Sequence, residues 1–161
     1  MARLSLSLVG SRNALAFLDM LAVSEGTAGN GDDGYDVLVG GALFQGYAEH
    51  PNRRVWLPRL GIYSTAAGRY QVLARTWGDL RRKLALRDFS PESQDLAAIE
   101  LIRECHALDD IHIGRFDAAV YACRRIWASL PGAGYGQREN KLSALRFAYQ
   151  SAGGVVAGEA A

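Results

Sequence analysis

Residues 13–24 read NALAFLDMLAVS, and Glu25 and Gly26 follow this run directly. Apolar side chains occupy most sides of a helix with this sequence, a pattern typical of a helix buried nearly all round. Ser11 or Asn13 can cap its first turn. The run therefore predicts a helix at the centre of the core, with a carboxyl group at its C-terminal end.

Glu25 is the sharpest candidate for chemistry in the chain. A carboxyl group beside apolar packing loses hydration, and this loss raises its pKa. A raised pKa lets a general acid keep its proton near neutral pH, and a glycine at position 26 lets a ligand or backbone approach closely. From the residues alone, a solvated glutamate at a helix end is the ordinary alternative.

The rest of the chain alternates between broken and periodic segments. Residues 27–34 are rich in Gly, Asn and Asp and predict a loop, while residues 35–60 hold short apolar bursts that predict short strands and turns. Helical patterns return later. We expect these helices over residues 68–84, from the start at Ser90-Pro91-Glu92, around 116–127 and over 139–150.

These segments predict an α+β protein with a helical lobe, a small β-containing lobe and a substrate cleft between them. No repeat or long linker divides the 161 residues, so we expect one catalytic domain over residues 1–161. Residues 1–12 and 154–161 are expected to form loose ends.

Composition excludes several functional classes. A net charge of +1 is too small for a dedicated nucleic-acid binder, and no run approaches the ~20 apolar residues of a membrane span. We therefore expect no nucleic-acid partner and no stable membrane association. His50, His106 and His112 lack the close spacing of a zinc site, so neither a metal nor a cofactor is expected. Cys105 and Cys123 are expected to be free, buried thiols.

Two further segments are candidates for ligand binding. The first runs from Ser64 through small residues to Tyr70 and Gln71, whose amide can bond sugar hydroxyls or acetamides. Its alternative is a helix start with Tyr70 in the core. The second holds Tyr135 between two glycines, followed by Gln137, and its alternative is a simple turn. A flat aromatic ring there would suit a sugar.

Five strings carry a resemblance over about residues 13–156. They are AFLDMLAVSEGT (16–27), GYDVLVGG (34–41), AGRYQVL (67–73), DFSPESQD (88–95) and IWASLPGAGYGQ (126–137). Together they resemble the lambda-type phage endolysins. The resemblance implies a lysozyme-like α+β fold and a peptidoglycan lytic transglycosylase that uses no metal or cofactor.

The resemblance also implies roles for individual residues. Glu25 falls on the family's catalytic glutamate, and Gln71 and Tyr135 take substrate-binding roles by analogy. Tyr35, within the second string, joins the candidate substrate-binding residues. The loop over residues 129–138 would form one lip of the cleft. The opposite lip, around residues 53–63, differs in sequence from the family.

The implied reaction cleaves the β-1,4 bond between N-acetylmuramic acid and N-acetylglucosamine and leaves a 1,6-anhydro ring. A hydrolytic lysozyme is the alternative within this class, and it needs a second carboxylate. Its candidates are Asp32, Asp33, Asp36 and Glu49. A non-catalytic glycan-binding protein on the same scaffold is the third reading.

The expected partner is the glycan strand of peptidoglycan, bound by a monomer. The N-terminal residues MARLSLSLVG lack a clear cleavage site, which argues against a secretory signal peptide. We therefore expect synthesis in the host cytoplasm and action on the periplasmic cell wall. Release would depend on a separate holin-type membrane protein, as the resemblance implies.

Overall fold

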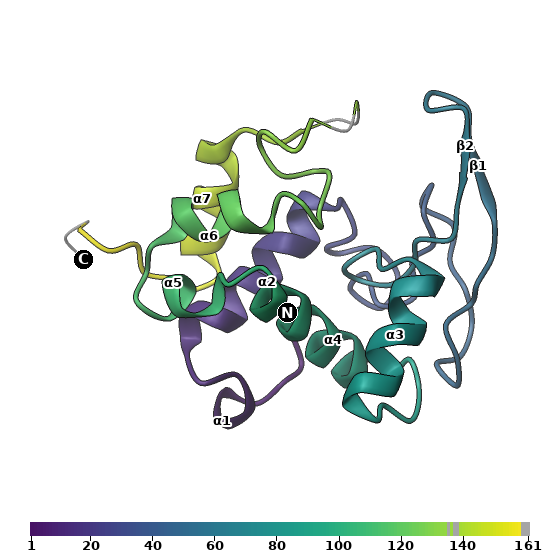
Figure 1. Cartoon of the computed structure of the whole chain (residues 1–161), viewed down its shortest axis with the longest axis horizontal. Coiled ribbons are helices and arrows are strands. Elements are labelled where there is room, and N and C mark those ends of the chain that lie inside the picture. Colours follow the sequence, from purple (N-terminus) through teal and green to yellow (C-terminus); the bar gives the residue numbers. More distant parts are fainter. Residues whose placement is uncertain (135, 137–138, 159–161) are drawn as a thin grey trace.

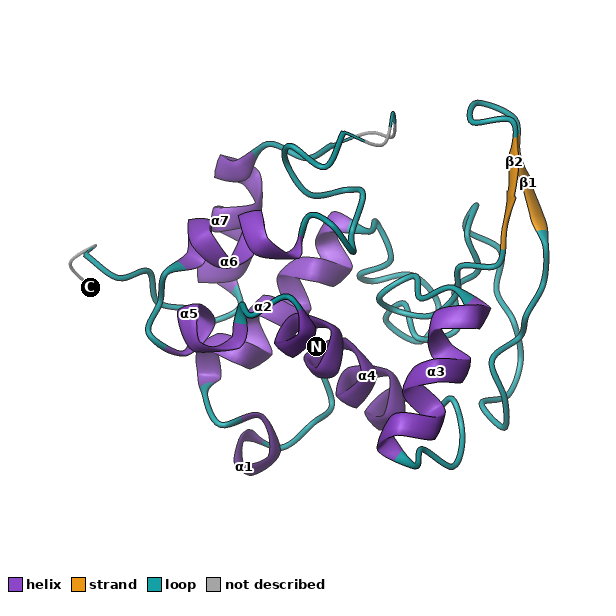
Figure 2. Ribbon diagram, in the orientation of Figure 1, coloured by secondary structure: helices purple, strands orange, loops and turns teal. Residues whose placement is uncertain are grey.

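The computed structural model describes residues 1–134, 136 and 139–158. Helices cluster at one end of the molecule, and a two-stranded sheet stands at the other (Figures 1 and 2). This arrangement confirms the predicted α+β class. The elements are α1 Leu6–Val9, α2 Arg12–Ser24, β1 Val55–Leu57, β2 Ile62–Ser64, α3 Ala74–Leu84, α4 Pro91–Glu104, α5 Leu108–His112, α6 Phe116–Cys123 and α7 Leu142–Ser151.

Helix α2 is the buried helix that the opening stretch predicts. The Ser11 hydroxyl caps it by accepting a hydrogen bond from the Ala14 N–H at 3.1 Å. Phe17, Leu18 and Leu21 have no exposed surface, and α2 packs against α7, α5 and α4. The helix ends at Ser24. Its burial therefore carries the following residue, Glu25, to the inner edge of the core.

Helix α4 begins as the Ser90-Pro91-Glu92 pattern predicts. The Ser90 hydroxyl accepts from the Ser93 N–H, and Pro91 occupies the first helical position, where it sacrifices no hydrogen bond. In Figure 1, α4 runs from beside α3 to the helical end of the molecule. Helix α4 therefore joins the two lobes.

Asp95 on α4 is a fully buried carboxylate that gathers distant segments. Its Oδ1 accepts the hydroxyl protons of Tyr35 at 2.8 Å and Tyr70 at 2.5 Å. Its Oδ2 accepts the backbone N–H groups of Arg3 at 2.6 Å and Leu4 at 3.0 Å. Burial raises the pKa of Asp95, and these donors oppose the rise. The four bonds fix the N-terminal segment and both tyrosine-bearing segments to α4.

The small lobe contains less regular structure than the sequence predicts. Strands β1 and β2 form an antiparallel hairpin in which Trp56 lies opposite Tyr63. Helix α3 begins at Ala74 rather than near residue 68. The delay has a backbone cause, because Gly68 and Gln71 have φ of 79° and 50°, in the left-handed region that interrupts a helix.

Some residues of both described chain ends pack against the body, while the expectation that residues 1–12 and 154–161 are flexible stays a prediction. Leu4 and Val9 join the hydrophobic core, as does Val156. The Gly114 carbonyl accepts the Ala157 N–H at 2.9 Å. These contacts tie the first residues to the core and residue 157 to the turn after α5.

Cys105 and Cys123 are free and buried, as predicted. Within the described residues, no helix is both long and apolar enough to cross a bilayer. Nor do the described histidines, cysteines and acids form any cluster that could hold a metal ion.

Replacing Asp95 by Ala should lower the free energy of unfolding by about 3 kcal/mol or more, because two buried hydroxyls and two backbone N–H groups lose their acceptor. Asp95→Asn keeps the volume and part of the accepting capacity, so its loss should be smaller. Urea denaturation of both variants measures the difference. The exposed Asp109→Asn serves as control, and equal stabilities for Asp95→Ala and this control would contradict the role of Asp95.

Candidate active site

Glu25 sits at the C-cap of α2, where the backbone turns away from the helix. Its N–H still donates to the Leu21 carbonyl at 2.9 Å, and Gly26 then takes φ of 71°. A left-handed glycine at this point ends the helix without steric cost. The next residue, Thr27, is buried, and its hydroxyl donates to the Arg69 carbonyl at 2.6 Å. Through this bond from Thr27, the Ser-Glu-Gly-Thr sequence fixes the end of α2 to the small lobe.

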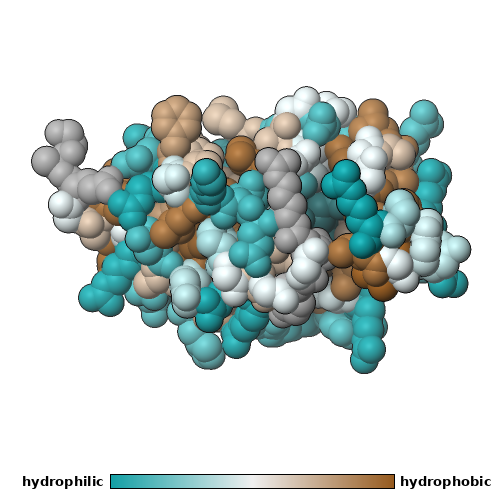
Figure 3. Space-filling view, turned by 90° about the horizontal axis from the view of Figure 1, so that it is seen from above, coloured by the Kyte–Doolittle hydropathy of each residue, from teal (hydrophilic) through white to brown (hydrophobic). Residues whose placement is uncertain are grey.

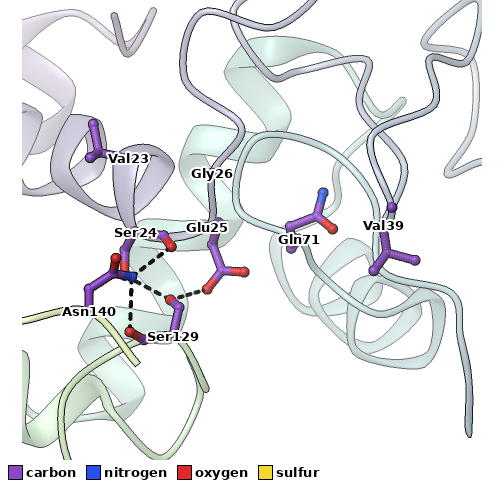
Figure 4. A pocket seen from close by; sticks show the side chains of 9 residues that line it. Val23, Ser24, Glu25, Gly26, Val39, Gln71, Ser129 and Asn140 are labelled. Atoms are coloured by element: carbon purple, nitrogen blue, oxygen red, sulfur yellow. Dashed lines mark hydrogen bonds between the residues drawn. The ribbon is translucent and has the colours of Figure 1, made fainter. Parts of the chain in front are cut away.

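A pocket of about 360 Å³ opens in front of Glu25 (Figure 4). One wall comes from the end of α2, the opposite wall from the small lobe, and the floor from the segment after α6. The lining residues are Val23, Ser24, Glu25, Gly26, Val39, Gly40, Gln71, Ser129 and Asn140. The pocket therefore lies between the helical lobe and the small lobe.

A hydroxyl holds the Glu25 carboxyl group in place. The Ser129 hydroxyl donates to Glu25 Oε1 at 2.6 Å, and it lies 2.8 Å from the Ser24 hydroxyl. The Asn140 amide nitrogen donates to the Ser24 carbonyl at 2.9 Å and to the Ser129 carbonyl at 3.1 Å (Figure 4). Asn140 thus joins the two serine-bearing segments beneath the carboxyl group.

Burial raises the pKa of Glu25 to about 7, and the hydrogen bond from Ser129 opposes part of this rise. Near neutral pH a large share of the carboxyl groups therefore keeps its proton, where an ordinary glutamate would be ionised. An acid with a pKa near the working pH can give up a proton and later take one back. The apolar run before Glu25 predicts such a rise.

Gln71 lines the pocket across from Glu25, with its amide group turned toward Val39 (Figure 4). Its amide nitrogen donates to the Gly68 carbonyl at 2.9 Å and to the Val37 carbonyl at 3.2 Å. No donor among the described residues meets its amide oxygen. That oxygen is therefore the group that Gln71 can offer to a ligand.

The structure places two of the predicted substrate contacts in the core instead. Tyr35 and Tyr70 are 0% and 1% exposed, and both hydroxyls are bonded to Asp95. Neither side chain can contact a sugar, so for both residues the prediction is wrong. Ser64 lies on β2, away from the pocket lining, and its hydroxyl accepts the Ala66 N–H at 3.2 Å. Tyr135 and Gln137 lie outside the described residues.

Sequence reasoning missed the supporting residues Ser24 and Asn140, and it placed Ser129 only at the edge of a lip. Ser24 and Ser129 lie 105 positions apart, and Asn140 lies 116 positions from Ser24. No local pattern marks a serine or an asparagine that bonds across such a separation. The family string over residues 126–137 was the signal available for Ser129.

The predicted candidates for a second carboxylate all lie outside the pocket lining. Asp33 forms an ion pair with the buried Arg69 at 2.6 Å, and Asp32 accepts the Tyr47 hydroxyl at 2.7 Å. Asp36 accepts the backbone N–H of Asp32 at 2.8 Å, and Glu49 is exposed on the surface. Among the described residues that line the pocket, Glu25 is the single carboxylate.

Comparison with known proteins matches this fold and site to one family. The Endolysin family model matches residues 15–156. The chain is 52% identical to the endolysin of Escherichia phage P2 over 164 residues, covering 91% of this chain and 96% of the relative. It is also 52% identical to the endolysin of Escherichia phage lambda over 147 residues, covering 88% and 91%.

Solved structures agree with the sequence relatives. The lysozyme of bacteriophage lambda, in complex with a chitohexasaccharide, superimposes with a TM-score of 0.87 at 48% identity, covering 91% of this chain and 97% of that one. A second structure of the same lysozyme gives a TM-score of 0.83 at the same identity and coverage. The predicted lysozyme-like fold is thereby confirmed.

Fold and pocket together define a lysozyme-like enzyme that degrades peptidoglycan. The chain belongs to the endolysin family, as its five strings predict.

Removing the Ser129 hydroxyl should shift the pH profile of activity. The hydrogen bond from Ser129 lowers the pKa of Glu25, so Ser129→Ala should raise that pKa further. Activity that needs protonated Glu25 falls as pH rises through this pKa, and the falling limb of kcat/KM should therefore move to higher pH. Ser129→Thr retains a hydroxyl and should restore the limb. An unchanged limb in Ser129→Ala would contradict the contact.

Glu25→Gln should make the protein more stable at pH 8 than the parent. The pKa of Glu25 is about 7 in the folded chain against 4.5 as its ordinary value, so between these pH values the folded state binds more protons. The parent's stability therefore decreases as pH rises through this window, and the variant loses this dependence. The gap should be roughly 1–3 kcal/mol at pH 8 and close to zero at pH 4. Urea titrations at both pH values measure it.

Proposed function

We propose that this endolysin is a lytic transglycosylase that cleaves the β-1,4 bond between N-acetylmuramic acid and N-acetylglucosamine. The observation that carries the proposal is the lone carboxylate in the pocket. Glu25 faces Gln71, Ser24, Ser129 and Asn140, and no second acid lines the described pocket. A hydrolytic glycosidase ordinarily uses two carboxylates, whereas one group that acts twice suffices for an intramolecular attack.

The reaction balances with Glu25 alone. Protonated Glu25 gives its proton to the glycosidic oxygen, and the bond from that oxygen to the muramic anomeric carbon breaks. The resulting carboxylate takes the proton of the muramic 6-hydroxyl, whose oxygen bonds to the anomeric carbon. The products are a free 4-hydroxyl on the N-acetylglucosamine side and a 1,6-anhydro ring on the other. No water is consumed, and Glu25 ends protonated.

The electrostatics of the pocket suit this double role. With a pKa raised to about 7, Glu25 is a strong enough acid to protonate the leaving oxygen and a strong enough base to accept the hydroxyl proton. Ser129 holds the carboxyl group through Oε1, which leaves Oε2 for the substrate. The geometry therefore separates the oxygen that anchors Glu25 from the oxygen available for the reaction.

Substrate binding follows from the two walls of the pocket. The related lambda lysozyme was solved with a chitohexasaccharide, a chain of β-1,4-linked N-acetylglucosamine. By analogy, a glycan strand would lie between the end of α2 and the small lobe, with the Gln71 amide oxygen accepting from an acetamide or hydroxyl group. A role for Tyr135 and Gln137 on the lip over residues 129–138 stays a prediction.

The proposal includes where the enzyme acts. An endolysin made in the host cytoplasm reaches the periplasmic wall only after a separate holin-type membrane protein opens the way. We propose the same dependence here, and we propose that the enzyme acts as a monomer.

The product identifies the reaction. Digestion of Gram-negative sacculi followed by mass spectrometry should give muropeptides with anhydro ends, each lighter by one water than a hydrolytic product. A product with a reducing N-acetylmuramic acid end would instead make the protein a muramidase. Intact sacculi that retain the protein after prolonged incubation would instead make the chain a non-catalytic glycan-binding protein.

Glu25→Gln should keep the fold and lower the cleavage rate by about 100- to 10,000-fold, because the amide can neither donate an acidic proton nor act as a base. Turbidity of permeabilised Gram-negative cells measures the rate. The exposed Glu49→Gln is the matched control and should clear cells like the parent. Normal clearing by Glu25→Gln would remove Glu25 from the mechanism.

A further inference from the structure

The hairpin β1–β2 carries an aromatic and cationic surface that the proposed reaction does not use. Trp56 and Tyr63 lie opposite each other on the two strands, with ring centroids 5.0 Å apart. Both are well exposed, at 49% and 57%. The Arg54 guanidinium lies 4.6 Å from the centre of the Tyr63 ring. We call Arg54, Trp56 and Tyr63 the outer face of the hairpin.

The register of the hairpin shows that the outer face points away from the catalytic pocket. Val55 points toward Gly40, because a Cβ placed on Gly40 would lie 3.7 Å from the Val55 Cγ1. Gly40 itself lines the pocket. Successive side chains on a strand point to opposite faces, so Trp56 points away from Gly40, and its cross-strand partner Tyr63 points with it. The inner face belongs to the cleft, and the outer face is a separate surface.

The charged side chains of the hairpin are all positive. Arg53, Arg54 and Arg59 are exposed, and residues 51–64 contain no acidic residue. No carboxylate among the described residues forms an ion pair with any of the three, although ten ion pairs are present elsewhere. Arginines without a carboxylate partner, beside exposed aromatic rings, suit a ligand that offers both flat apolar rings and carboxylates.

We propose that the outer face binds a second peptidoglycan strand, next to the one in the catalytic pocket, and anchors the enzyme to the wall. Sugar rings would stack on Trp56 and Tyr63, while the arginines would pair with carboxylates of the peptide stems. The inference rests on the proposed peptidoglycan substrate. Because peptidoglycan is a net of neighbouring strands, a surface turned away from the cleft can reach a strand that the cleft does not hold.

The distribution of aliphatic groups favours a glycan over a lipid surface. A membrane-binding surface gathers aliphatic and aromatic side chains on one face. Here Val55, Leu57 and Ile62 share the inner face by register, whereas the outer face combines aromatic rings with a guanidinium group. From above, hydrophobic and hydrophilic groups are intermixed at the end of the molecule that carries β1 and β2 (Figure 3). The part of the surface seen in this view shows no continuous apolar patch of the kind that a membrane anchor carries.

The test measures binding to intact sacculi in the Glu25→Gln background, where the wall is not degraded. Adding Trp56→Ala and Tyr63→Ala should weaken co-sedimentation with sacculi about tenfold or more. Adding Arg53→Gln, Arg54→Gln and Arg59→Gln should weaken it too and reduce its dependence on salt. Tyr121→Ala is the matched control. Tyr121, on α6, has a side chain that is 59% exposed, and the Arg124 guanidinium carbon lies 3.7 Å from the centre of its ring. This control should bind like its parent.

Urea denaturation of the aromatic variant should match that of its Glu25→Gln parent, which shows that the hairpin change leaves the fold intact. If the aromatic variant is destabilised, the arginine variant, which preserves both rings, decides the question by its sacculus binding. Undiminished sacculus binding by the hairpin variants would overturn the proposal. The proposal would also be overturned if the hairpin variants kept their binding to sacculi and lost binding to vesicles of phosphatidylglycerol. That result would assign the outer face to a lipid. If the protein with Glu25 intact fails to cleave sacculi, the proposed function itself is wrong.

Discussion

The active-site cleft depends on a carboxylate that solvent never reaches. Asp95 accepts four hydrogen bonds, from two tyrosine hydroxyls and two backbone N–H groups. One of these donors, Tyr70, precedes Gln71 in the pocket wall, and its carbonyl accepts the indole N–H of Trp127 at 3.0 Å. Trp127 lies two residues before Ser129, which anchors Glu25. A single buried acceptor therefore aligns the small-lobe wall with the segment that forms the pocket floor.

Asp95 and Glu25 show how two buried carboxyl groups take different roles. Burial raises the pKa of both. Asp95, however, is surrounded by donors that occupy both of its oxygens, so its charge serves the fold. Glu25 has one described side-chain donor and opens onto a pocket, so its proton is available to a ligand. The number of hydrogen-bond donors and the access to a pocket, rather than burial, distinguish the structural acid from the proposed catalytic one.

The parts of the molecule governed by local rules could be predicted from the sequence. The apolar run of α2, the Ser90 cap and the burial of the carboxyl at residue 25 each depend on a few neighbouring residues. The start of α3 could not be predicted, because Gln71 takes a positive φ. Hydrogen bonds from its side chain to the Gly68 and Val37 carbonyls stabilise this strained conformation. The cores around Tyr35 and Tyr70 and the placement of Asn140 arise from contacts between distant segments, which no local pattern encodes.

The long separation between the pocket's parts has a consequence during synthesis. Glu25 emerges from the ribosome early, whereas Ser129 and Asn140 follow more than 100 positions later. Until those residues are made, Glu25 lacks the Ser129 hydroxyl that holds its carboxyl group and the Asn140 amide beneath it. The pocket is therefore complete only once the last helices have closed over α2.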